Sequence, residues 1–156
     1  MIELLYFASQ IQCGPGGSLL NIQVDVYQQQ QLVKTMNVNE KALIPVNSVN
    51  ELNFKYKIID NTTRCSLQTP SEMSLKPGDP LPTMAGIYEQ DSVQTLLSGL
   101  NNYEELFLVE LGTTNRNSAA FDLQDVVFKV DNDPTVSTPP TPPTPPTPPT
   151  ITFFPD

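Results

Sequence analysis

The sequence predicts an all-β protein, an antiparallel β-sandwich or open barrel of about six to eight short strands with one short helix. An extended polyproline II arm is predicted to follow at the C-terminus. Three observations lead to this fold class. Apolar and polar residues alternate with a period of two in several short segments, turn-forming clusters recur about every ten residues, and helices long enough to connect parallel strands are missing from the pattern.

The N-terminal part of the chain carries three strand patterns. Residues 2–12 are apolar and aromatic up to the turn cluster at residues 14–17, and residues 20–27 alternate without interruption. Residues 32–38 fit the returning strand of a hairpin. The glutamine run 28–31 is therefore interpreted as the polar tip of that hairpin, or as a strand edge.

The middle of the chain carries two more strand patterns and a loop. Pro45 places the short apolar segment 42–46 at a sheet edge or a strand start. Residues 52–58 alternate and end at a polar turn. Residues 69–86 hold four prolines and Gly78, so we expect a structured loop there and no long regular element.

The sequence of residues 91–130 predicts one helix and one hairpin. Asp91 can cap a helix of about two turns, for which Gly99 offers a stop. Residues 103–111 include a continuous apolar run, which is typical of a strand buried on both faces or of a short core segment. We expect this segment to pair with a final strand at residues 121–130.

We divide the chain into a β-sandwich body at residues 1–136, a Thr-Pro-Pro arm at 137–150 and an apolar docking tip at 151–156. The eight prolines of the arm favour the extended polyproline II conformation. At about 3.1 Å per residue, Thr138 to Thr150 would hold the tip roughly 40 Å from the body.

Charge is uneven along the chain. Residues 1–78 hold six acidic and six basic residues, whereas residues 79–156 hold eleven acidic residues and two basic ones, Arg116 and Lys129. An acidic field repels phosphate backbones and anionic lipid, so we expect neither nucleic-acid nor membrane binding. A basic protein surface or a cation is the favoured partner. We also expect no signal peptide and no transmembrane segment, because no apolar run approaches about 20 residues.

The chain has no histidine, which removes the commonest general base and transition-metal ligand. We expect no enzyme and no cofactor. A pair of carboxylates acting as acid and base would have to come from Glu104, Glu105 and Glu110, which no distinguishing context marks. We expect no metal ion either. If calcium binds, the candidate ligands are Asp122, Asp125, Asp131 and Asp133, which the predicted strand would hold about 20 Å apart as two pairs. The other interpretation of these four residues is solvated caps at strand ends.

The two cysteines, Cys13 and Cys65, lack the spacing of a zinc or redox motif. They either form one disulfide or remain as two buried thiols, because the redox compartment is unknown.

The arm is the feature that most favours a function. A solvating tail has no need to end in two phenylalanines, so we expect the tip residues Ile151, Thr152, Phe153, Phe154 and Pro155 to dock on a neighbouring subunit, in a pocket or as an added edge strand. The chain is therefore predicted to be a structural protein of a large assembly, such as a virion decoration, head-completion or tail component, and to form homo-oligomers. The alternative is a calcium- or carbohydrate-binding extracellular adhesion module with a proline-rich stalk.

Overall fold

The computed structural model describes residues 1–12, 18–59, 65–81, 91–118 and 123–133. Eight strands in this part of the chain form two antiparallel sheets, which confirms the predicted fold class. The five-stranded sheet has the order β4-β1-β8-β7-β6, and the three-stranded sheet has the order β3-β2-β5. The elements are β1 (Ile2–Ala8), β2 (Asn21–Gln28), β3 (Gln31–Met36), β4 (Lys41–Ile44), the 3-10 helix η1 (Val49–Glu51), β5 (Asn53–Ile59), β6 (Ser71–Leu75), α1 (Asp91–Ser98), β7 (Glu104–Glu110) and β8 (Val126–Asp131).

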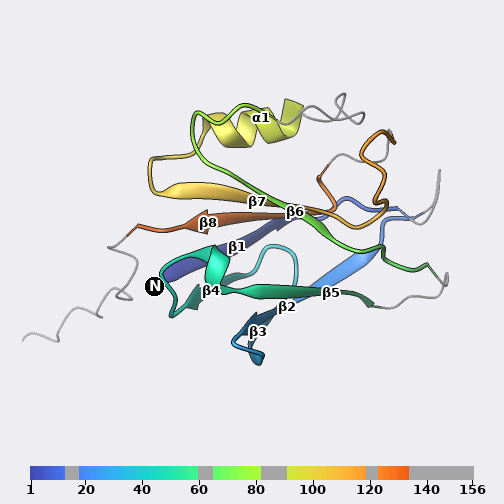
Figure 1. Ribbon diagram of the computed structural model, residues 1–156, viewed down its shortest axis with the longest axis horizontal. Helices are drawn as coiled ribbons and strands as arrows, with labels where there is room; N and C mark the ends of the chain where they lie inside the picture. Colours follow the sequence, from blue (N-terminus) through green and yellow to red (C-terminus); the bar gives the residue numbers. More distant parts are fainter. Residues whose placement is uncertain (13–17, 60–64, 82–90, 119–122, 134–156) are drawn as a thin grey trace, which may run out of the picture.

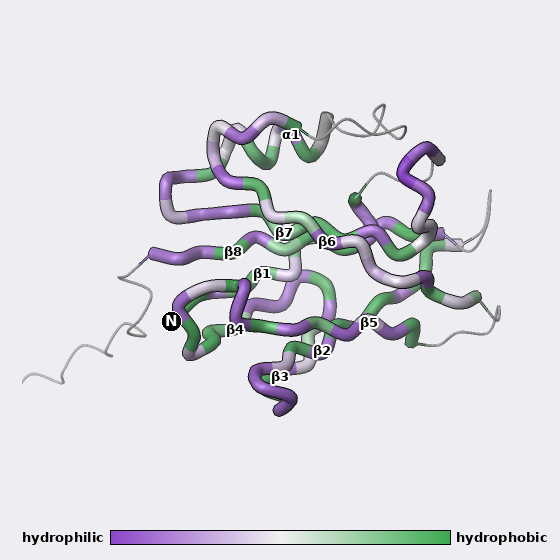
Figure 2. Tube along the Cα trace, viewed as in Figure 1, coloured by the Kyte–Doolittle hydropathy of each residue, from purple (hydrophilic) through white to green (hydrophobic). Residues whose placement is uncertain are grey.

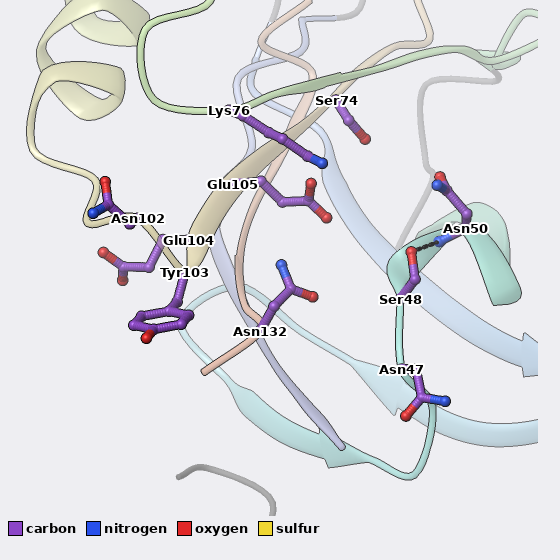
Figure 3. A pocket seen from close by; sticks show the side chains of 10 residues that line it. All are labelled: Asn47, Ser48, Asn50, Ser74, Lys76, Asn102, Tyr103, Glu104, Glu105 and Asn132. Carbon is purple, nitrogen blue, oxygen red and sulfur yellow. Dashed lines mark hydrogen bonds between the residues drawn. The ribbon is translucent and has the colours of Figure 1, made fainter. Parts of the chain in front are cut away.

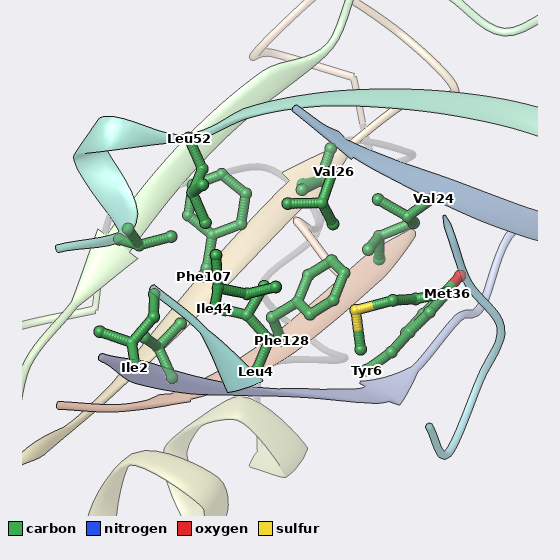
Figure 4. Close-up of a cluster of buried hydrophobic side chains, with 14 of the residues drawn as sticks. Ile2, Leu4, Tyr6, Val24, Val26, Met36, Ile44, Leu52, Phe107 and Phe128 are labelled. Atoms are coloured by element: carbon green, nitrogen blue, oxygen red, sulfur yellow. The ribbon is translucent and has the colours of Figure 1, made fainter. Parts of the chain in front are cut away.

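The main hydrophobic core lies between the two sheets (Figures 1 and 4). Its centre is aromatic: the ring of Phe128 lies 5.0 Å from that of Tyr6 and 5.6 Å from that of Phe54. The Tyr6 hydroxyl donates a hydrogen bond to the carbonyl oxygen of Ile22, 2.9 Å away on the other sheet. Burial raises the pKa of Tyr6 to about 12, although a hydrogen bond with the Ser9 side chain acts in the opposite direction. The tyrosine therefore joins the two sheets as a neutral donor.

A second, smaller core lies on the outer face of the five-stranded sheet, beneath α1 (Figure 1). The apolar residues of α1 lie on the side of the helix that faces the sheet (Figure 2). The helix spans eight residues and is followed by Gly99, as the sequence predicts. The buried members of this core are Leu75, Val93, Leu97, Leu106, Leu108, Leu123 and Val127.

Strand β7 is buried along its whole length, which confirms the interpretation of its continuous apolar run. Phe107 and Val109 face the main core, whereas Leu106 and Leu108 face the core beneath α1. The predicted pairing with the last strand is also confirmed, with Phe107 opposite Phe128. Since both faces of β7 are covered, an alternating pattern is not needed there.

The boundaries of three segments differ from the predictions. The first strand ends at Ala8 and not at Gln12. A five-residue strand, β6, lies between Pro70 and Pro77 where we expected only a loop, because the two prolines leave just enough chain for an edge strand. Strand β8 begins at Val126, since the positive φ of Leu123 (57°) is incompatible with an extended strand.

The glutamine run forms the hairpin tip between β2 and β3, as predicted. Gln29 and Gln30 both adopt positive φ angles, 50° and 67°. Two consecutive residues of this kind make the two-residue turn whose twist matches a β-hairpin.

Cys65 is disulfide-bonded, and the other cysteine of the chain is Cys13, which lies outside the described residues. This excludes the alternative in which Cys65 is a reduced thiol. The arm and the tip, residues 137–156, also lie outside the described residues, so the predicted domain division stays a prediction. In the described ranges, no helix has the length and apolar character needed to cross a bilayer.

Candidate functional site

The acidic residues suggested as calcium ligands lie at opposite ends of β8. Asp125 immediately precedes the strand, whereas Asp131 ends it and Asp133 follows it, about 20 Å further along. Asp122 lies outside the described residues. Among the residues that the structure describes, no group of three or more acidic or cysteine side chains is arranged to hold a metal ion.

Asp125 is not the solvated cap that one interpretation expected, because its side chain is buried. Its Oδ2 atom accepts hydrogen bonds from the backbone N–H groups of Leu111, at 2.7 Å, and Gly112, at 2.9 Å. Glu110, fully buried, accepts from the N–H of Gly112 at 2.8 Å and from that of Thr113 at 3.3 Å. Through these hydrogen bonds, the two carboxylates link the turn after β7 to the segment before β8.

Gly112 is packed tightly against this pair of acids. A Cβ atom at this position would lie 3.2 Å from Glu110 Oε2 and 3.6 Å from Asp125 Oδ2. The hydrogen bonds to backbone N–H groups and the absence of space indicate a structural role for Glu110 and Asp125.

The structure separates Glu110 from Glu104 and Glu105, the two of these acids that line one cavity. Glu104 and Glu105 are adjacent in β7, so their side chains point to opposite faces of the sheet. Glu110 lies about 16 Å from Glu105 along the strand. Glu110 is therefore too far from the other two carboxylates to act with either of them on one bond.

Glu104 is fixed by an ion pair and by the chain before β7. Its Oε2 atom lies 2.7 Å from the Lys129 Nζ atom, and its Oε1 atom accepts a hydrogen bond of 2.9 Å from the Asn101 N–H. Burial opposes ionisation of Glu104, but the Asn101 and Lys129 interactions outweigh it, and the pKa is lowered below its usual value.

This lowered pKa predicts how the stability of a Glu104→Gln variant depends on pH. A carboxyl group with a lowered pKa in the folded state contributes stability above its unfolded pKa of about 4.3 and loses it as pH falls through the folded-state pKa. We expect the variant to be less stable than the parent by about 1 kcal/mol at neutral pH. The difference should shrink below about pH 4, and urea unfolding at a series of pH values measures it. A difference that stays constant or grows in acid would contradict the assignment.

A polar cavity of about 400 Å³ opens at the end of the sandwich where β7 begins and β8 ends (Figure 3). Four separate parts of the chain form its wall: the turn before and within η1, the end of β6, the start of β7 and the residue after β8. We call it the end cavity. Its lining residues are Asn47, Ser48, Asn50, Ser74, Lys76, Asn102, Tyr103, Glu104, Glu105 and Asn132.

Glu105 lies within the end cavity and is only 5% exposed (Figure 3). Within the described ranges, its carboxylate makes no hydrogen bond and no ion pair. Sequence reasoning considered Glu105 only as a catalytic acid and missed the cavity. The one signal in the sequence was the abundance of asparagine around residues 47–50 and 101–102, which by itself indicates only turns.

The edge strand β3 exposes two apolar side chains. Leu32 is 50% exposed and Val33 is 37% exposed, and β3 is the last strand of its sheet. It lies on the far side of the molecule from α1 (Figure 1). The opposite edge strand, β5, is tied to the other sheet, because the Tyr56 hydroxyl donates a 2.8 Å hydrogen bond to Glu72 on β6.

Comparisons of the chain with protein-family models, with curated proteins and with solved structures found no match.

Proposed function

We propose that the chain is a non-enzymatic structural protein of a large assembly, such as a decoration, head-completion or tail component of a virion. The β-sandwich is the body of the subunit. Residues 137–150 carry the tip to a neighbouring copy, where Ile151 to Pro155 dock. The observation that carries the proposal is the uncovered, apolar edge of β3.

An exposed strand edge presents unpaired backbone groups that an extended segment can join. Natural proteins usually protect such an edge with charges, prolines or a covering element. Residues 26–33, which include the β2–β3 turn and the first half of β3, contain no charge and no proline. The tip segment Ile151 to Phe154 consists of residue types that favour strands, so it suits the role of an added strand.

The charges support the same pairing. Residues 137–155 carry no charged side chain, so the acidic second half of the body does not repel the arm. Strand β3 carries one exposed charge, Lys34, whereas β5 carries two lysines, Lys55 and Lys57. An uncharged arm that docks on the edge of an identical subunit closes a ring or builds a lattice, which is why we infer a homo-oligomer.

The proposal is tested by the molar mass of the full chain and of two variants. We expect Leu32→Asp to dissociate the oligomer, since a buried charge at the joined edge costs several kcal/mol. Leu43→Asp is the matched control, because Leu43 on β4 is also a leucine of an edge strand and is 41% exposed. Light scattering coupled to size-exclusion chromatography measures the masses. If both variants keep the parent mass, or if the parent itself is a monomer, the edge of β3 is not the docking surface.

The effect of calcium on thermal stability distinguishes the alternative, an extracellular adhesion module, from the assembly proposal. The thermal midpoint of the full chain and of residues 1–136 is measured with and without calcium. The assembly proposal expects loss of the oligomer on truncation and no calcium effect. A large rise of the midpoint with calcium in both forms would favour the adhesion module instead.

A further inference from the structure

We propose that the end cavity binds a neutral, polyhydroxylated ligand, namely a saccharide of one or two rings. No residue of β3 lines this cavity. Its volume, about 400 Å³, falls in the range of small-molecule sites. The inference comes from which polar groups the cavity leaves without protein partners.

Glu105 is the central group. A carboxylate with 5% exposure is normally paired, because a buried charge without partners is costly. In the described part of the chain it has no such partner, and its carboxylate extends into the cavity (Figure 3). Its two oxygens accept hydrogen bonds but donate none, so the missing partner is a donor such as a hydroxyl group.

The amides around Glu105 point to the same ligand class. Four asparagines line the cavity, and their side chains make no hydrogen bond with any described residue; three are exposed, and the last is partly buried: Asn47, Asn50, Asn102 and Asn132. Each amide offers both a donor and an acceptor, and a hydroxyl group likewise donates one hydrogen bond and accepts others. A ligand that carries several hydroxyl groups can therefore satisfy all four amides and the carboxylate together.

Charge argues against an ionic ligand. Glu104 is paired with Lys129, so its charge is already neutralised. The two remaining charges of the lining, Glu105 and Lys76, are opposite in sign. The cavity therefore has no net charge to attract either a cation or an anion. Tyr103, which is 52% exposed, adds an aromatic ring against which the apolar face of a sugar can pack.

The walls of the cavity are held in place without a ligand. Glu51 Oε2 accepts hydrogen bonds from the N–H groups of Asn47, at 2.7 Å, and Ser48, at 3.0 Å, and the Ser48 side chain accepts one from Asn50. On the other wall, the N–H of Asn132 donates to the carbonyl oxygen of Tyr103 at 2.8 Å. Such preorganisation lowers the entropy lost on binding.

The test uses the full chain and nuclear magnetic resonance. The methyl glycosides of glucose, galactose, mannose, fucose and N-acetylglucosamine are titrated to about 10 mM, which detects millimolar dissociation constants. At least one glycoside is expected to shift the backbone amide signals of residues 47–50, 74–76, 102–105 and 132, and few others. Glu105→Gln should weaken that binding at least about tenfold, because the amide replaces one strong acceptor with a donor.

Two further variants keep the test interpretable. Asn132→Ala removes a side chain without a described partner, so the fold should persist while binding weakens. Glu40→Gln, outside the cavity and exposed, is the matched control and should bind like the parent. The proposal is overturned if no glycoside moves these signals, if Glu105→Gln binds as well as the parent, or if butylamine titrates the cavity while the sugars do not, which would make it a site for a cation.

Discussion

Replacing Asp125 by alanine is expected to lower the free energy of unfolding by about 3 kcal/mol. The buried carboxylate accepts hydrogen bonds from the N–H groups of Leu111 and Gly112. Alanine would leave the buried N–H of Leu111 without that partner, and it would leave Glu110 alone to hold the turn. Urea-induced unfolding followed by tyrosine fluorescence or circular dichroism measures the loss.

Two control variants define what the loss means. Asp131→Ala, at the other end of β8, removes one partly buried acceptor for the Asp133 N–H and should cost less than about 1 kcal/mol. Asp125→Asn keeps an acceptor oxygen but loses the charge, so its loss of stability should lie between those of Asp125→Ala and Asp131→Ala. Equal stabilities of Asp125→Ala and Asp131→Ala would show that the buried carboxylate does not support the turn.

Replacing Phe153 and Phe154 together by alanine is expected to weaken self-association by about 3–6 kcal/mol, if each ring is fully buried in the neighbouring subunit. The physical reason is the loss of apolar area that the assembled state would remove from water. Sedimentation velocity over a range of protein concentrations measures the change in the dissociation constant.

The matched control for the tip is Thr141→Ala together with Thr144→Ala, in the middle of the repeat, where we expect the arm to act only as a spacer. This variant should assemble like the parent. If the phenylalanine variant assembles like the parent as well, the C-terminal segment is a tail without a docking role, which contradicts the proposed function.

The proposal for the end cavity and the proposal for the tip are tested by different measurements, sugar binding and self-association. Loss of assembly in the Phe153→Ala/Phe154→Ala variant with sugar binding intact would support both proposals separately. Sugar binding without any assembly would favour the adhesion alternative, since a saccharide site and a stalk are what that alternative requires.

Several features of the fold could be predicted because they depend on neighbouring residues in the chain. The alternation in residues 20–27 determines which side chains of β2 are buried, and Asp91 and Gly99 bracket a helix of the predicted length. Strand β6 could not be predicted in the same way. Its five residues are too few for a clear pattern, and they form a strand because β7 offers a free edge to pair with.

The sequence by itself determined the all-β class and the β7–β8 hairpin, because strand alternation and turn residues act locally. Only the tertiary structure decided the roles of the acidic residues. Asp125 is buried because the turn after β7 packs on it, and Glu105 lies in a cavity because residues 47–50, 74–76 and 132 meet beside it. Those contacts join segments far apart in the chain, so no local pattern could distinguish Glu105 from the adjacent Glu104.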